Sequence, residues 1–219
     1  MVVKENDDDN SHGSLARRAT GFLKNEIISG KLKPGTNIAV SEISEGIYSA
    51  ADIREGLSRL LGTQLVFDAD DGFKVADQNS DDLDDLRHTR FLLEGVALRD
   101  SIMNGDLEWE RLVTARLEQL LGVTPAAWLS PESAEFRKRF HLALISASGL
   151  KRIRAFLDIV YDQCSWYSIT NKGGACTDFS GHKALAEAAL ARDPDAASEQ
   201  LRMLLFPVAP ANGTASIDN

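Results

Sequence analysis

The chain of 219 residues has a formal net charge of −9, is 43% hydrophobic and 26% charged, and contains two cysteines. These values are typical of a soluble protein with one large domain or two small ones. Two cysteines are too few for a disulfide framework, and no apolar run approaches the roughly 18 residues that a membrane span needs. We therefore expect a cytoplasmic protein without a membrane partner. The acidic total counts against strong non-specific binding of nucleic acid, although a local basic face remains compatible with it.

The N-terminal part begins with a polar segment and continues with a helical pattern. Residues 1–13 are acidic and poor in apolar side chains, and we expect a disordered tail there. From Ser14 the apolar residues recur at spacings of three and four, which predicts an amphipathic helix that Gly30 ends. The Pro and Gly of residues 31–35 then predict a turn.

The next segment predicts two helices and a β-hairpin. Ser41 is the expected N-cap of a short helix, and Ser49 is the expected N-cap of a second helix over residues 50–61. Residues 65–67 and 73–75 are short β segments around an Asp-rich turn. Three helices followed by a hairpin are the order of a winged helix-turn-helix, so residues 14–76 are the predicted DNA-binding domain.

Beyond Ala76 the pattern is helical throughout, so the fold class is mainly α. A polar connector leads into the first helix, in which Leu92, Leu93, Val96 and Ala97 form an apolar stripe. We expect residues 77–206 to form an all-α helical bundle and residues 207–219 to be a disordered tail. The predicted helices span residues 82–104, 107–122, 130–147, 150–170, 178–192 and 194–206.

Five segments along the chain are informative together: EIISGKLKPGTNI, IREGLSRLLGTQLV, LDDLRHTRFLLEGVAL, RFHLALISASG and GHKALAEAALARDPDAA. They resemble motifs of the FadR-like branch of the GntR family of transcription regulators, in the same order and at similar spacings. The resemblance implies a winged helix-turn-helix followed by an all-helical effector-binding domain, the FCD domain. It also implies a ligand-responsive regulator that binds a palindromic DNA operator as a homodimer and is released or tuned by a small organic acid.

The DNA-binding candidates that follow from this resemblance are basic or hydroxyl side chains of the winged domain. Where the family commonly has SRTPVREAL, this chain has SAADIREGL, so Ala50 replaces an Arg and Asp52 a Pro. The wing turn DADDG contains carboxylates that repel phosphate, and the domain has eight basic and eight acidic side chains. The alternative for each basic candidate is a solvated side chain without a DNA contact. The alternative for Ser49 is the capping of a helix. The candidates are Lys31, Lys33, Ser49, Arg54, Arg59 and Lys74.

The family's metal site is incomplete in this sequence. FCD domains typically hold a divalent metal with an Asp and a His four residues apart and with two further His. His141 and His182 match two of these ligands, but Arg137 stands at the Asp position and Leu204 at the last His. Two imidazoles without a carboxylate are a poor metal site, and we expect no tightly bound metal and no other cofactor.

Arg137 can supply the missing positive charge to a small organic anion through a bidentate pair, and Arg90 matches a pocket Arg of the family. The predicted effector site is therefore Arg90, Arg137, His141 and His182. In the alternative interpretation Arg137 reaches solvent or pairs with Glu94 or Glu135, and both His are buried and hydrogen-bonded.

Two other functions remain open at this point. A degenerate regulator would keep the fold, bind DNA weakly and act as a small-molecule or protein-binding dimer. A helical enzyme or metal-binding protein is the other, but the sequence contains no nucleophile elbow, phosphate-binding Gly loop or HExxH motif.

Overall fold

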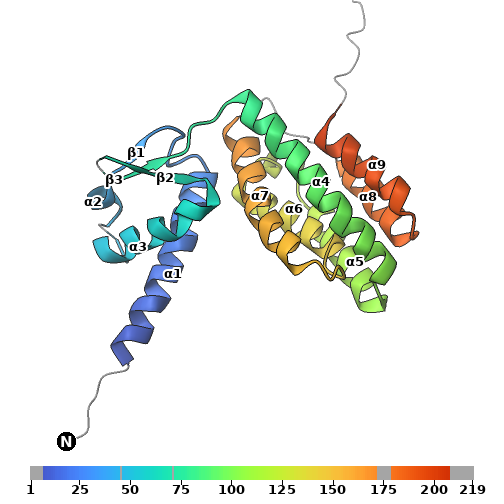
Figure 1. Ribbon diagram of the computed structural model, residues 1–219, viewed down its shortest axis with the longest axis horizontal. Helices are drawn as coiled ribbons and strands as arrows, with labels where there is room; N and C mark the ends of the chain where they lie inside the picture. The colour runs from blue at the N-terminus through green and yellow to red at the C-terminus, as the bar shows by residue number, and fades with distance from the viewer. Residues whose placement is uncertain (1–6, 45, 71, 172–178, 208–219) are drawn as a thin grey trace, which may run out of the picture.

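The computed structural model describes residues 7–44, 46–70, 72–171 and 179–207, with side chains from residue 15 onward. A winged helix-turn-helix lies on one side of the molecule and a helical bundle on the other (Figure 1). The mainly α fold class predicted from the sequence is confirmed. None of the described helices combines the length and the hydropathy of a membrane-crossing segment.

The winged domain contains a three-stranded antiparallel sheet with strand order β1-β3-β2. In the hairpin, Val66 lies opposite Val75 and Phe67 opposite Lys74, and β1 adds Asn37 to the other side of Lys74. Its elements are α1 (Asp7–Ile28), β1 (Asn37–Ile38), α2 (Val40–Ile43), α3 (Ala50–Leu60), β2 (Val66–Ala69) and β3 (Gly72–Val75).

The core of this domain forms where α1 crosses α3. Leu23 of α1 and Ile53 and Leu57 of α3 are fully buried. Gly56 allows the close crossing, because a Cβ there would lie 2.9 Å from Leu23 Cδ1 and 3.1 Å from the backbone nitrogen of Thr20. The apolar spacing of three and four residues from Ser14 onward predicted the buried face of α1.

Two helix starts differ from the sequence predictions. α1 begins at Asp7, so residues 7–13 are helical and not part of a disordered tail, and residues 1–6 lie outside the described residues. α2 begins at Val40 with Ala39 at its N-cap, which makes no side-chain cap bond, so Ser41 is not the cap. Val40 packs against the buried core of the domain, and this packing fixes the start of a four-residue helix more strongly than a hydroxyl does.

The second part of the molecule is a bundle of long helices, as predicted. Their ends agree with the predicted ends to within three residues, and side chains of Asn79, Asp106, Ser130 and Asp193 cap four of them. The helices are α4 (Ser80–Asn104), α5 (Leu107–Leu121), α6 (Pro131–Leu144), α7 (Lys151–Thr170), α8 (Phe179–Leu190) and α9 (Pro194–Leu205).

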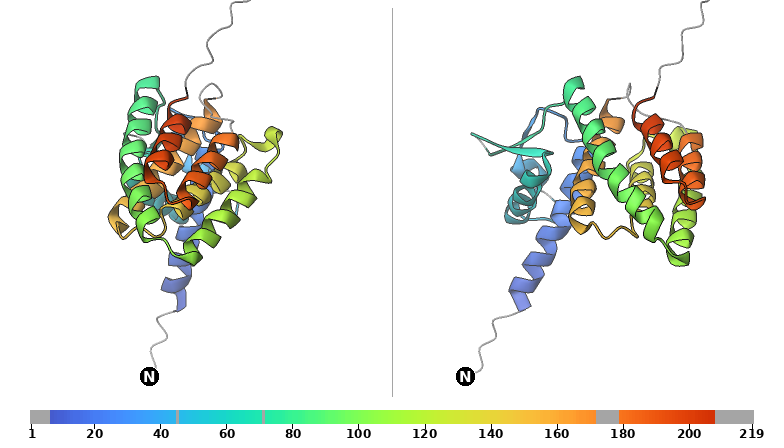
Figure 2. Two further views of the ribbon diagram at one scale, coloured as in Figure 1. Left: turned by 90° about the vertical axis from the view of Figure 1, so that its right-hand side faces the viewer. Right: turned by 45° about the vertical axis from the view of Figure 1, so that its right-hand side comes forward.

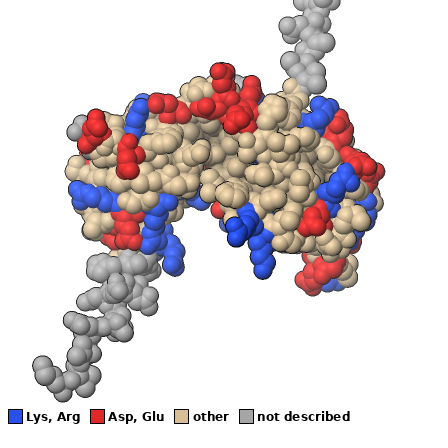
Figure 3. All heavy atoms as spheres, in the orientation of Figure 1, with Lys and Arg blue, Asp and Glu red and all other residues tan. Residues whose placement is uncertain are grey.

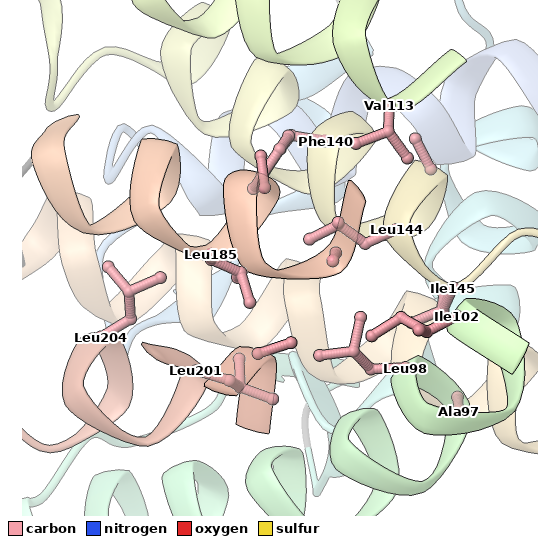
Figure 4. Packing of buried hydrophobic residues seen from close by; sticks show 14 of the residues in the cluster. Ala97, Leu98, Ile102, Val113, Phe140, Leu144, Ile145, Leu185, Leu201 and Leu204 are labelled. Carbon is pink, nitrogen blue, oxygen red and sulfur yellow. The ribbon is translucent and has the colours of Figure 1, made fainter. Parts of the chain in front are cut away.

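The bundle core gathers side chains from helices that are distant in sequence. Leu98 of α4, Leu144 of α6 and Leu201 of α9 extend into the same interior (Figure 4). The side views show α8 and α9 together on the side of the bundle away from the winged domain (Figure 2). Half of the apolar stripe predicted for α4 is not part of this core, because Leu92 and Val96 are 67% and 56% exposed.

One helix, α7, belongs to both parts of the molecule. Its residues Trp166 and Tyr167 are buried in the hydrophobic core of the winged domain. The side chain of Gln163 donates a hydrogen bond to the carbonyl oxygen of Thr63 at 2.9 Å. The division at residue 76 therefore separates two segments of chain but not two independent cores.

Candidate functional site

The four predicted effector residues line one cavity of about 90 Å³ in the bundle. Arg90 comes from α4, Arg137 and His141 come from α6, and His182 comes from α8. Leu204 of α9, at the position of the family's last His, also lines this cavity. The i, i+4 spacing of Arg137 and His141 places both on one face of α6, which explains how one helix supplies two of the lining groups.

A carboxylate that the sequence analysis did not include in the site organises two of these residues. Glu94 is fully buried and accepts hydrogen bonds from Arg90 Nε at 2.8 Å and from His141 Nδ1 at 2.6 Å. Arg90 and Glu94 are four residues apart on α4, so their pairing is visible in the sequence. The contact between Glu94 and His141 joins residues that are 47 positions apart, so it is not visible in the sequence.

The charges of this group follow from its burial. Burial opposes ionisation of Glu94, but His141 and Arg90 outweigh it and lower the pKa of the carboxyl to about 2. Burial lowers the pKa of His141 below its ordinary value of 6.5, and Glu94 only partly offsets this. At neutral pH His141 is therefore a neutral imidazole with its proton on Nδ1, facing Glu94, and its Nε2 is left as an acceptor.

Arg137, one helical turn before His141 on α6, is held in place by Trp128 and Ser133. Its guanidinium carbon lies 4.7 Å from the centre of the Trp128 ring, and Nη1 donates to Ser133 Oγ at 2.9 Å and to the carbonyl oxygen of Trp128. Glu135, one of the partners considered for Arg137, accepts a hydrogen bond from Arg139 Nε at 2.7 Å. A stacked and hydrogen-bonded guanidinium keeps a fixed orientation, which favours recognition of a planar anion.

Tyr161 of α7 lines the cavity and was not among the residues that the sequence analysis selected. Its hydroxyl is buried, and Arg90 lies over its ring at 4.9 Å. Burial and the nearby Glu94 carboxylate raise the pKa of Tyr161 well above its ordinary value. The phenol therefore stays protonated and can donate a hydrogen bond. A tyrosine within a helical apolar pattern gives no signal of this role.

The donors around the cavity do not fit the metal that FCD domains typically hold. The rings of His141 and His182 lie 5.5 Å apart, but the cation Arg137 occupies the carboxylate position. Both oxygens of Glu94 already accept hydrogen bonds. Within the described part of the chain, no three His, Cys, Asp or Glu side chains form a group that could hold a metal ion.

The predicted DNA-binding residues come from three parts of the winged domain: the turn after α1 (Lys31 and Lys33), α3 with its N-cap (Ser49, Arg54 and Arg59) and β3 (Lys74). Arg54 and Lys33 are exposed. Basic side chains gather on the side of the winged domain that contains α1 and α3, and acidic ones gather at the start of α4 (Figure 3). Three candidates make ion pairs at the surface: Lys31 with Glu26 at 2.7 Å, Arg59 with Glu55 at 2.6 Å and Lys74 with Asp77 at 2.8 Å.

Ser49 has the capping role that the sequence predicted for it. Its Oγ accepts a hydrogen bond from the backbone nitrogen of Asp52 and donates one to Asp52 Oδ2 at 2.6 Å. Asp52 also accepts from the backbone nitrogen of Ser49, which completes a capping box. Asp52, which stands where the family has Pro, thus stabilises the start of α3. Of the three wing carboxylates, Asp68 and Asp70 are exposed, and Asp71 lies outside the described residues.

Comparison with known proteins gives matches along most of the chain. The family model of the FCD domain matches residues 85–206. The HTH-type transcriptional regulator BphR of Paraburkholderia xenovorans (strain LB400) is 35% identical over 200 residues, which are 87% of this chain and 82% of BphR. The HTH-type transcriptional repressor GlaR of Escherichia coli (strain K12) is 26% identical over 200 residues, which are 85% of this chain and 91% of GlaR.

Solved structures give the same result for the fold. E. coli McbR/YncC has a TM-score of 0.72 at 19% identity and covers 87% of this chain and 93% of its own. A GntR transcriptional regulator from Rhodococcus sp. RHA1 has a TM-score of 0.68 at 21% identity, covering 88% and 94%. At these identities the two structures support the fold alone.

Proposed function

This chain belongs to the GntR family of transcription regulators, in the branch with an FCD domain, and we propose that it is a homodimer that binds a palindromic operator and is released or tuned by a small organic acid. It is a transcription regulator and not an enzyme. The observation that supports the effector is that Arg90, Arg137, His141 and His182 line a single cavity.

The chemistry of the walls supports an anion with a small apolar part. Arg137, with its guanidinium fixed by Trp128, provides a cationic group that can bind a carboxylate. Leu204 and Leu205 of α9 form an apolar wall of the same cavity. A carboxylate at Arg137 would thus place its hydrocarbon part against leucine side chains, where burial is favourable.

Calorimetric titration of the purified protein with sodium acetate, pyruvate, benzoate and succinate tests this proposal. We expect at least one of these anions to bind, and Arg137→Gln to weaken its binding about tenfold or more, because a charge-assisted hydrogen bond is removed. Arg139→Gln is the matched control, since Arg139 lies on the same helix and is half exposed in a pair with Glu135. Unchanged affinity in Arg137→Gln would contradict the proposal.

The homodimer is supported by the outward face of α4. Leu92, Val96 and Met103 follow each other at spacings of four and seven residues, which places them on one face, and they are 67%, 56% and 72% exposed. An apolar helix face of this kind is typical of a contact with a second copy of the chain. Sedimentation of Leu92→Glu/Val96→Glu should show a monomer. Met203→Glu on α9, also at an exposed apolar position, should stay dimeric.

DNA binding is proposed to occur through α3, with Arg54 at the operator. A footprint over the DNA upstream of the coding region, at low and at physiological salt, tests it. We expect protection that Arg54→Ala removes. A regulator that binds DNA only weakly is the second candidate, because Asp68 and Asp70 are exposed on the wing and Arg59 and Lys74 are paired with carboxylates. No protection at micromolar protein would favour it.

A further inference from the structure

We propose that an ion-pair chain formed by Lys138, Asp162 and Lys24 transmits occupancy of the effector cavity to the winged domain. The inference rests on the proposed function, since it concerns the regulation of that same cavity. Lys138 lies on α6 and lines the cavity, Asp162 lies on α7, and Lys24 lies on α1 of the DNA-binding domain. The three residues are far apart in sequence and meet where the two parts of the molecule touch.

The carboxylate of Asp162 pairs with one lysine from each of the two parts. Asp162 Oδ1 accepts a hydrogen bond from Lys138 Nζ at 2.7 Å, and Asp162 Oδ2 accepts one from Lys24 Nζ at 2.9 Å. Lys138 also pairs with Asp158 at 2.8 Å. Both Lys138 and Asp162 are buried, at 8% and 7% exposure. Charges in such surroundings interact much more strongly than at a surface, so the position of one affects the others.

The cavity and this ion-pair chain share the same wall. Lys138 follows Arg137 and precedes His141 by three residues, and Tyr161, whose ring lies near His141, precedes Asp162 on α7. Before binding, two ammonium groups face the two carboxylates Asp158 and Asp162. An anion in the cavity adds a negative charge beside Lys138 and competes with Asp162 for its ammonium group. The ion pair between Asp162 and Lys24 then becomes stronger, so anion binding tightens the contact between α7 and α1.

The apolar packing around Asp162 makes α7 suitable for this role. Trp166, one helical turn after Asp162, is buried in the core of the winged domain, while Tyr161 and Cys164 line the cavity. A displacement of α7 at the cavity therefore cannot occur without a change at α1. This supplies the coupling free energy between two distinct sites that allosteric control requires.

A double-mutant cycle tests the ion-pair chain without any ligand. Lys24→Met, Lys138→Met and the double variant are compared by amide hydrogen exchange of α1 in the full chain. Each single variant leaves Asp162 with one lysine partner, and we expect the exchange rate of α1 amides to rise about fivefold. The double variant leaves Asp162 without a lysine partner. Its increase in exchange rate should therefore exceed the product of the increases in the two single variants. Lys183→Met, which removes an exposed pair with Glu187 on α8, is the matched control. If the increase in the double variant equals the product of the increases in the two single variants, the proposal is wrong.

Addition of sodium benzoate or sodium pyruvate tests the link to the cavity. With 5-fluorotryptophan in the protein, the Trp128 signal reports the cavity and α1 exchange reports the winged domain. In the wild type we expect the anion to change both the Trp128 signal and the exchange rate of α1. In Lys24→Met we expect it to change the Trp128 signal alone. An equal α1 response in Lys24→Met would overturn the ion-pair chain. If the Trp128 signal of the wild type does not change on addition of either anion, the result contradicts the proposed carboxylate cavity. The double-mutant cycle without ligand then tests the ion-pair chain by itself.

Discussion

Replacement of Glu94 by Gln tests the organisation of the cavity directly. The substitution keeps the shape of the side chain but removes the negative charge that faces Arg90 and His141. Arg90 would remain buried, with a side chain only 12% exposed, and without its counter-charge. Because breaking a buried ion pair leaves an uncompensated charge, we expect a large loss of stability and not the small loss typical of surface pairs.

The pKa of Glu94 gives the magnitude of this loss. A carboxyl whose pKa is about 2 in the folded protein and 4.5 in the unfolded chain contributes about 3 kcal/mol at neutral pH. Because the folded-state pKa is the lower one, this stabilisation is present above pH 4.5 and is lost as the pH falls towards 2. Removal of one partner from a buried pair costs a similar ~3–5 kcal/mol. Glu94→Gln should therefore destabilise the protein by about 3 kcal/mol at pH 7.

Urea denaturation at pH 7, followed by circular dichroism, measures the change. Glu135→Gln is the matched control, since Glu135 pairs with Arg139 at the same i, i+4 spacing but both are 49% exposed. Its effect should stay within about 0.5 kcal/mol. Arg90→Met/Glu94→Gln should be more stable than Glu94→Gln alone, because no unpaired charge remains. If Glu94→Gln unfolds at the same urea concentration as Glu135→Gln, the buried pair does not have the assigned role.

Three further outcomes follow from the structure. Ser49→Ala should cost about 1 kcal/mol of stability through the lost cap of α3, whereas Ser41→Ala should have little effect, and thermal unfolding of both variants compares them. Gly35→Ala should cost about 1–2 kcal/mol because residue 35 has φ +73°; an unchanged melting temperature would contradict this. The lowered pKa of His141 means that the unfolded chain binds a proton more readily, so stability should fall as the pH drops below 6.5, and less so in His141→Asn.

The helices and the composition of the cavity could be predicted because they depend on local pattern. Apolar spacing gave the helices of the bundle, and the motif positions gave the four residues that meet at the cavity. Glu94 was considered only as a partner of Arg137, since nothing local shows that His141 lies against it. Trp166 was likewise assigned to the bundle, yet it completes the core of the winged domain. Both misses concern contacts between distant segments, which periodicity does not encode.

Arg137 and Leu204, which replace two of the family's metal ligands, both fit a cavity without a metal ion. Arg137 alone would be a cation in an apolar wall, but Trp128 and Ser133 hold its guanidinium and leave it facing the cavity that His141 also lines. Leu204 alone would only delete a ligand, but beside Leu205 it extends an apolar surface. A fixed guanidinium replaces the charge of a metal ion without its demand for chelating oxygens. If the cavity binds the proposed anion, we therefore expect a carboxylate attached to a hydrocarbon part to bind more tightly than a chelating hydroxy acid.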